Sequence, residues 1–303
     1  MANVIWREIR STFQRRDRMV YQLLFINVVV FLVLNLLRIP FYFMNVPFDI
    51  YEIRNYLGLP ADIKTLVSQP WTLVTYMFTH IEFMHILFNM LVFFWFGKIL
   101  AEFAGNKKIL PVYLLGGITG GLLYIAAYNV FPVFGNSVSD ARAWGASASV
   151  MAIVFAATTL VPDYTMFLLL FGAVRIKWIA LVLAVLDLIS LPTDNPGGHI
   201  AHLGGALFGF FYIKQLQRGR DPGSRINSIA DRIANIFKRK PDLKVTYRRK
   251  EKSTVSSGYQ QKLPGKNDKQ AKLDTILDKI SQAGYDSLSK EEKDFLFRMS
   301  KED

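Results

Sequence analysis

The chain has 303 residues, of which 51% are hydrophobic and none is cysteine, which excludes a disulfide framework. Its net charge of +12 lies at the two ends: residues 1–18 carry +3, residues 214–303 carry +9, and the segment between them is neutral. Basic ends around a hydrophobic block are typical of the cytoplasmic flanks of a membrane protein, a reading favoured over a nucleic-acid-binding surface.

Six apolar segments are predicted to form membrane-crossing helices. The first follows a basic stretch, as a signal peptide would, but no cleavage site comes after it, so it is expected to be retained. The fourth is roughly 22 Å long and falls short of the ~30 Å hydrocarbon core, so it requires helices around it and water at its end. The six segments are approximately 21–37, 83–103, 109–131, 147–161, 176–192 and 200–217.

The distribution of Lys and Arg in the connections predicts the orientation. The connections 98–108 and 162–177 are basic, whereas 132–146 contains a single Arg and 192–199 contains neither Lys nor Arg. Because basic connections stay on the cytoplasmic side, both termini are expected in the cytoplasm. The longer connection 38–82 is then external, and its aromatic content predicts that it is partly folded at the membrane surface.

The C-terminal tail changes character. Residues 225–237 place isoleucines at helical spacing before a Lys-Arg-Lys run, which predicts an amphipathic helix, either bound to an anionic leaflet or simply solvated. Residues 241–269 are polar and predicted to be disordered. Residues 271–300 predict a helical hairpin, with Ser289 and Glu292 forming a capping box for its second helix. Because two short helices bury little surface, this hairpin is expected to bind a protein partner or a second copy of the chain.

The predicted fold class is therefore an all-α membrane protein: a six-helix transmembrane bundle with a short helical hairpin in its tail. Four parts are expected. They are a basic cytoplasmic N-terminus at 1–20, the membrane domain at 21–217, a basic cytoplasmic linker with the amphipathic helix at 218–269, and the hairpin at 270–303.

All four histidines flank or enter predicted spans, where an ionisable side chain is costly and usually functional. They are His80, His85, His199 and His202. His85 and Asn89 are four residues apart, so they share one face of the second helix.

Ser147 stands at the external start of the fourth helix, after Gly145 and Ala146. A hydroxyl at this position is close to unpaired backbone N–H groups and to the positive end of the helix dipole. That environment stabilises an oxyanion. The simpler alternative is that Ser147, or Ser149, only caps the helix.

The sixth helix carries His199 and His202 on one face, followed by the GxxxG pair Gly205 and Gly209. Small residues let two helix backbones approach closely, and small residues at the start of the fourth helix, including Gly145, offer a matching surface. Close packing of the two helices would bring His202 within hydrogen-bond reach of the serine hydroxyl, as a general base requires. Generic helix packing is the alternative meaning of the GxxxG.

Three motifs, THIEFMHILFN, GASA and AHLGGALFG, together resemble those of the rhomboid family of intramembrane serine proteases, in the family's order, over residues 20–215. The resemblance implies a six-helix rhomboid-like bundle and a dyad of Ser147 (nucleophile) and His202 (general base) without a third acid. It also implies an oxyanion site from His85, Asn89 and the backbone N–H of the serine. The implied activity is cleavage of single-span membrane proteins, with no metal and no cofactor.

Two positions depart from the family pattern. Ala148 follows the nucleophile where glycine is usual, and Trp71-Thr72 stands in the external connection where Trp-Arg is usual. Asp187, the one acid inside a late span, is predicted to be structural and bonded to another helix.

Three other readings remain open. A rhomboid-like adaptor would bind transmembrane helices without cutting them. A zinc protein would use the histidines, although the HExxH motif of membrane zinc proteases is absent. A transporter would use the histidines and Asp187 as a proton relay, although no inverted repeat is visible. The predicted location is the inner (plasma) membrane of a bacterium, with transmembrane substrates and the bilayer as partners and no nucleic acid.

Overall fold

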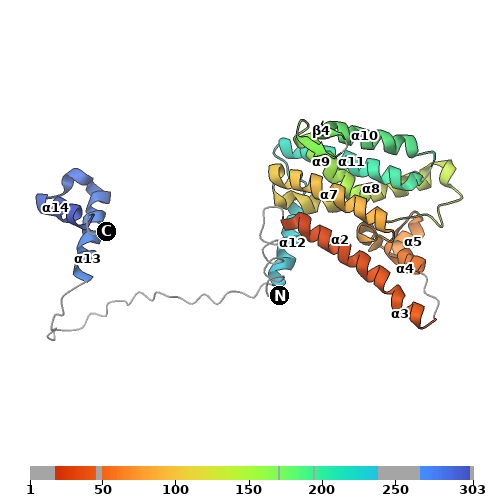
Figure 1. Cartoon of the computed structure of the whole chain (residues 1–303), viewed down its shortest axis with the longest axis horizontal. Helices are drawn as coiled ribbons and strands as arrows, with labels where there is room; N and C mark the ends of the chain where they lie inside the picture. The colour runs from red at the N-terminus through yellow and green to blue at the C-terminus, as the bar shows by residue number, and fades with distance from the viewer. Residues whose placement is uncertain (1–17, 46–49, 170, 194, 238–266, 301–303) are drawn as a thin grey trace. The chain divides into compact units, whose positions relative to one another are not determined.

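The computed structural model describes residues 18–45, 50–169, 171–193, 195–237 and 267–300. The chain divides into two compact units, Met1–Lys240 and Pro241–Asp303, and each is described by itself (Figure 1). Residues 1–17 of the predicted N-terminal flank and residues 238–266 of the predicted linker lie outside the described residues. The prediction of disorder is wrong for residues 267–269, which form the start of a helix.

The first unit is mostly helical, with two small antiparallel sheets. Its elements in chain order are α2 (Arg18–Leu36), α3 (Arg38–Phe43), α4 (Ile50–Leu57), β1 (Leu59–Pro60), α5 (Ile63–Ser68), α6 (Thr72–Thr75), η1 (Tyr76–Phe78), α7 (Phe83–Ala104), η2 (Asn106–Lys108), α8 (Ile109–Val130), η3 (Pro132–Phe134), β2 (Arg142–Ala143), α9 (Ser147–Leu160), β3 (Thr165–Leu168), β4 (Gly172–Arg175), α10 (Ile176–Ser190), α11 (Pro196–Gln217) and α12 (Ser224–Phe237).

All six predicted apolar segments form helices: α2, α7, α8, α9, α10 and α11. Among the described residues, three stretches, Arg18–Phe43, Phe83–Ala104 and Asn106–Val130, are long and apolar enough to cross a membrane. Helix α11 begins four residues earlier than predicted. Asn195 adopts a left-handed conformation there and its side chain accepts a hydrogen bond from the N–H of Gly198 (3.2 Å), while Pro196 fits the first helical position.

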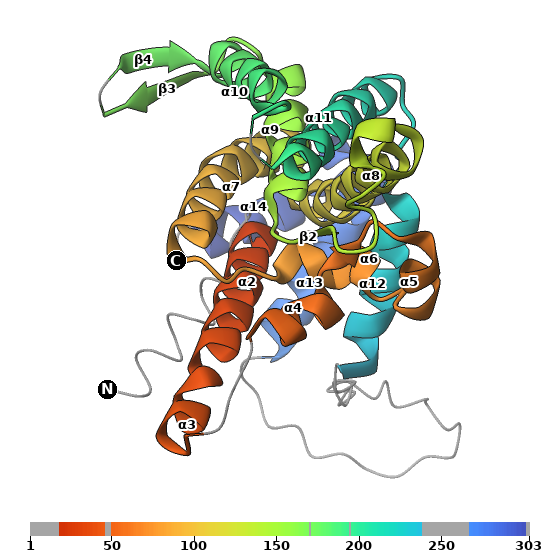
Figure 2. The same cartoon turned by 90° about the vertical axis from the view of Figure 1, so that its right-hand side faces the viewer.

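Helix α9 is the centre of the bundle. Nine of its 14 residues are buried, so it is covered on nearly every side, and at about 21 Å it has the predicted short length. Figure 2 shows α9 between α7 on one side and α8 and α11 on the other, and all three contact it. By contrast, α10 buries only Ile176, Ala180 and Asp187 and covers the outside of the bundle.

Helix α2 packs along α7 and is joined to α8 by a buried polar contact. Asn27 is fully buried and its Nδ2 donates to the hydroxyl of Tyr113 (3.1 Å), which in turn donates to the carbonyl of Met77 (3.0 Å). A buried amide is costly unless it is bonded, so these contacts fix α2 against α8.

The connection between α2 and α7 contains four short helices, a 3-10 turn and a strand, which confirms that it is partly folded. Its strand β1 pairs antiparallel with β2, matching Leu59 with Ala143 and Pro60 with Arg142. This pairing holds the connection against the segment that leads into α9. The second sheet, β3 with β4, joins α9 to α10.

The second unit contains α13 (Asn267–Ala283), η4 (Tyr285–Ser287) and α14 (Lys290–Met299). The predicted capping box is confirmed: the Ser289 hydroxyl accepts from the N–H of Glu292, and the Glu292 carboxylate accepts from the N–H of Ser289. Lys279 of α13 is 2.9 Å from the same carboxylate, so one ion pair joins the two helices. In the first unit, α12 forms where the amphipathic helix was predicted.

Candidate active site

One cavity of about 740 Å³ contains the predicted catalytic groups. Ser147, from the first turn of α9, His202, from α11, and His85 and Asn89, from α7, all line it. The structure therefore brings together residues that lie up to 117 positions apart in the sequence. Within the described residues no hydrogen bond joins the Ser147 hydroxyl to His202. Hydrogen bonds between catalytic groups often form only when substrate binds, so the missing bond is compatible with Ser147 and His202 acting as a pair.

The turn before Ser147 is anchored by two consecutive backbone amides. The N–H of Gly145 donates to the carbonyl of Tyr76 (2.9 Å), and the N–H of Ala146 donates to Nε2 of His80 (3.1 Å). Burial lowers the pKa of His80 to about 3, so its ring is neutral and Nε2 keeps the lone pair that accepts this bond. The start of α9 is thereby fixed before any substrate is present.

Two features require a glycine at position 145: its backbone conformation and the close approach of the His85 ring. Its φ of +113° is one that side-chain-bearing residues rarely adopt, and a Cβ here would lie 2.6 Å from Cε1 of His85. The missing side chain therefore lets His85 lie directly beside the turn that presents Ser147. Asn89, one helical turn further along α7, donates from Nδ2 to the carbonyl of His85 (2.8 Å). The side chain of Asn89 is thus bonded to the main chain of His85, and both residues line the cavity with Ser147.

The second serine of the motif lies elsewhere. Ser149 is fully buried, and its Oγ lies 2.4 Å from where a Cβ of Gly117 on α8 would be. Ser149 therefore faces the interior against α8, whereas Ser147 is half-buried and lines the cavity. This placement favours Ser147 as the reactive hydroxyl.

The GxxxG of α11 packs directly against backbone of α9. A Cβ on Gly205 would lie 2.0 Å from the carbonyl oxygen of Ala148, and one on Gly209 would lie 2.1 Å from that of Ala152. Only hydrogen fits at these positions, so the two helices touch through their main chains. The contact lies one turn from His202 and fixes that residue's distance from α9.

The methyl group of Ala148 is accommodated by a second glycine. Ala148 is 1% exposed, and a Cβ on Gly120 of α8 would lie 2.8 Å from its methyl carbon. Because Gly120 has no side chain, the methyl group of Ala148 fills the space beside it. The alanine in place of the family's usual glycine therefore fits without displacing Ser147.

Replacing Ala148 with glycine is expected to lower stability by about 1–2 kcal/mol, because a buried methyl and its helix propensity are both lost. Cleavage by the variant should stay within about threefold of the wild type, since the α9–α11 contact through the carbonyl is kept. Thermal unfolding in detergent and cleavage assays measure the two effects, with the fully buried Ala156→Gly on α9 as the matched control. A tenfold gain in activity would show instead that the methyl of Ala148 displaces Ser147.

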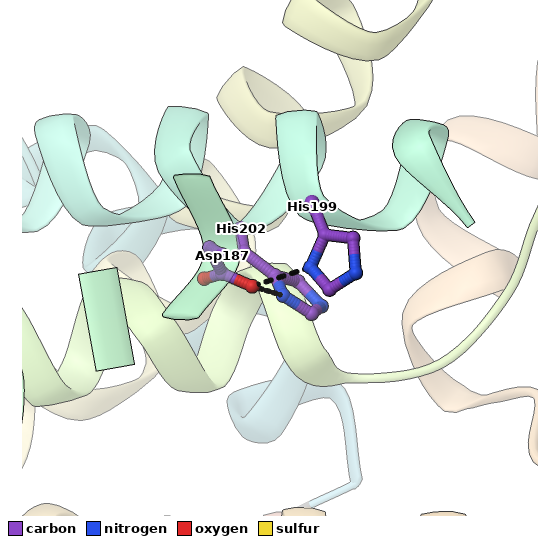
Figure 3. A group of neighbouring side chains, drawn as sticks. All are labelled: Asp187, His199 and His202. Atoms are coloured by element: carbon purple, nitrogen blue, oxygen red, sulfur yellow. Dashed lines mark hydrogen bonds and ion pairs between the residues drawn. The ribbon is translucent and has the colours of Figure 1, made fainter. Parts of the chain in front are cut away.

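Asp187 of α10 lies against both histidines of α11. Its Oδ1 is 2.8 Å from Nδ1 of His202 and 2.7 Å from Nδ1 of His199, as Figure 3 shows. The prediction that Asp187 bonds to another helix is confirmed. A carboxylate therefore contacts the ring of His202, a contact that the resemblance to the rhomboid family did not imply, while the predicted dyad itself stays a prediction. The motifs did not indicate this contact, since Asp187 lies outside all three.

Two other features of the site were not predicted. His80 was noted only as one of four histidines, and its bond to the N–H of Ala146 spans 66 residues. The glycines of α8 were read only as part of an apolar span, yet side chains on them would collide with β1, α9 and α11. They are Gly116, Gly117, Gly120 and Gly121. The paired spacing in GGITGG was the available signal for a close-packed helix face.

The three predicted site motifs fall within a match to a family model. The Rhomboid domain model matches residues 67–218, which is half of the chain. A second model, a family of unknown function (DUF6576), matches residues 264–302, a segment that includes all of α13 and α14.

Curated relatives agree with the first match. RHOMBOID-like protein 12, mitochondrial, of Arabidopsis thaliana is 28% identical over 158 residues, 49% of this chain and 47% of that protein. Presenilin-associated rhomboid-like protein, mitochondrial, of Homo sapiens is 28% identical over 164 residues, 53% and 41% of the two chains. Rhomboid protein 1, mitochondrial, of Saccharomyces cerevisiae is 26% identical over 196 residues, 64% and 52%. The chain thus spans about half the length of these relatives. The domain model covers half of the chain, and residues of all three motifs line one cavity. The chain therefore belongs to the rhomboid family.

Proposed function

We propose that the chain is an intramembrane serine endopeptidase that cleaves single-span membrane proteins. The observation that carries this proposal is the convergence of Ser147, His202, His85 and Asn89 on one cavity at the start of α9. A nucleophile, a base and polar groups that can bind an oxyanion are the parts that acyl transfer needs.

In the proposed reaction, Nε2 of His202 takes the proton of the Ser147 hydroxyl as Oγ attacks the carbonyl carbon of the scissile bond. His85, Asn89 and the N–H of Ser147 would stabilise the resulting oxyanion. The protonated His202 then gives its proton to the leaving amine, which breaks the C–N bond and leaves an acyl ester on Oγ. Water, activated by the same imidazole, hydrolyses the ester and restores the serine.

The proposed setting is a six-span bundle with both termini in the cytoplasm and with the cavity near the opposite surface. The burial of the short helix α9 supports this, because a helix of about 21 Å survives in a bilayer only when other helices surround it. The bacterial inner membrane remains our prediction for its location, while the relatives above are named as mitochondrial. Binding of a partner or a second copy through α13 and α14 also remains a prediction.

The test is cleavage of a reporter protein with one transmembrane segment, by purified wild type and His202→Ala in liposomes. We expect product from the wild type and a loss of at least about 10³-fold in the variant, since the general base is removed. Cleavage should persist in a chelator, because no step uses a metal. Binding of the reporter without product from the wild type would favour the adaptor reading, and abolition by the chelator would favour the zinc reading.

A further inference from the structure

One carboxylate oxygen, Oδ1 of Asp187, serves two imidazoles. Asp187 is 7% exposed, and Oδ1 lies at nearly equal distances of 2.8 and 2.7 Å from Nδ1 of His202 and Nδ1 of His199 (Figure 3). The two rings are perpendicular to each other, with centroids 5.8 Å apart, so they approach the oxygen from different directions.

These contacts specify a tautomer. An ionised carboxylate can only accept hydrogen bonds, so Nδ1 must carry the proton in both rings. In a neutral His202, Nε2 then holds the lone pair, and Nε2 is the atom that must take a proton from the serine. An imidazole without this partner could equally place its proton on Nε2 and would then be no base.

The placement of Asp187 is costly and specific. Helix α10 buries only three of its 15 residues, and Asp187 is the one polar residue among them. Buried acids inside membrane spans are expensive and usually functional. A simple tie between α10 and α11 would need only one bond, yet the carboxylate contacts the residue that lines the cavity with Ser147.

We propose that Asp187 is a positioning residue that holds His202 in its basic tautomer and orientation, and that His199 shares the carboxylate and weakens its pull on His202. This inference rests on the proposed peptidase function. It extends the Ser–His dyad to a Ser–His–Asp triad contributed by α9, α11 and α10.

The variants Asp187→Asn and His199→Ala are expected to act in opposite directions. In D187N the amide can donate to Nδ1, which lets the ring proton move to Nε2, so kcat should fall by about 10²–10⁴-fold with KM within about threefold of wild type. The acid limb of the pH–rate profile should move to lower pH, because protonated His202 loses a neighbouring anion. In H199A the whole carboxylate faces His202, so the acid limb should move to higher pH.

A control variant and the other ionisable groups of the cavity show whether the shifts in pH profile come from Asp187. The exposed Asp163→Asn is the matched control. Asp163 follows the C-terminal end of α9, and its carboxylate pairs with Lys177 and Arg175 rather than with a residue of the cavity. The other titratable groups around the cavity are Glu82 just before α7, His85 from α7, Tyr124 and Tyr128 from α8, and Arg142 from β2. None of them is changed by these variants, so the two opposite shifts would belong to Asp187.

Several results would overturn the inference. The first is a D187N enzyme whose kcat equals that of the wild type. The second is an equal loss of activity in D187N and H199A with unchanged pH–rate profiles, which would mean that the cluster only joins α10 to α11. If D187N does not fold, the inference is overturned when the acid limb of the H199A profile stays in place or moves to lower pH. Loss of wild-type activity in a chelator would identify the cluster as a metal site. The chelator result would overturn the proposed function as well. After any of the other results, the proposed function is still supported as long as the wild type cleaves the reporter. A wild type that cleaves nothing overturns both.

Discussion

Replacing Ser147 with alanine is expected to lower peptide-bond hydrolysis by at least about 10⁴-fold, because the acyl intermediate needs this oxygen. The fold should be retained. Ser147 is only half-buried at the first turn of α9, and no bond of its hydroxyl to the described residues is lost. Single-turnover cleavage of the reporter in liposomes measures the effect. Residual activity then reports only what the cavity achieves through binding and oxyanion stabilisation.

Ser149→Ala is the matched control for that experiment. Its hydroxyl is fully buried and has no hydrogen-bond partner in the described part of the chain, so its removal costs little and can even stabilise the protein. Cleavage by this variant should remain within about threefold of wild type. The reverse pattern, an inactive Ser149→Ala and an active Ser147→Ala, would contradict the assignment of the nucleophile.

Gly205→Ala is expected to lower both the stability of the bundle and its activity. The added methyl would lie 2.0 Å from the carbonyl oxygen of Ala148, which belongs to the backbone and cannot turn away. The helices α9 and α11 must therefore separate, at a cost of about 1–3 kcal/mol for overpacking. Because His202 lies one turn away on α11, a displacement of about 1 Å should lower cleavage by about 10²-fold. Thermal unfolding in detergent and the reporter assay measure the two effects.

Gly97→Ala on α7 is the control for this substitution. Its added methyl would meet only side-chain atoms, at 3.2 and 3.3 Å from Val20 and 3.5 Å from Phe93, which can shift by small amounts. Activity should therefore be nearly unchanged. If Gly205→Ala were as active as Gly97→Ala, the close backbone contact would not be what places His202.

The sequence predicted the parts of this molecule that local patterns encode. The apolar periods located the six helices, and the short length of the fourth indicated its central position. The spacing of His85 with Asn89 and the GxxxG after His202 each described one face of one helix. Together these patterns predicted that the polar faces of α7 and α11 meet the start of α9. In the structure, residues of all three helices line one cavity.

The remaining contacts depend on how distant segments are brought together. The bond from the N–H of Ala146 to His80 depends on the fold of the connection before α7, which has no regular pattern. The contact of Asp187 with His202 depends on the tight connection between α10 and α11, where Asn195 takes a left-handed conformation. The fit of Ala148 depends on Gly120, and a glycine in an apolar helix does not reveal which neighbour it faces.

The most direct test of the central claim is to treat the wild-type protein with a fluorophosphonate probe and to locate the modified residue by mass spectrometry. The probe reacts only with a serine whose hydroxyl is activated by a base. We expect a single adduct on Ser147 that is absent from His202→Ala, whereas Ala156→Gly is labelled like the wild type. An adduct on another serine, or no adduct on a protein that still cleaves its substrate, would contradict the account.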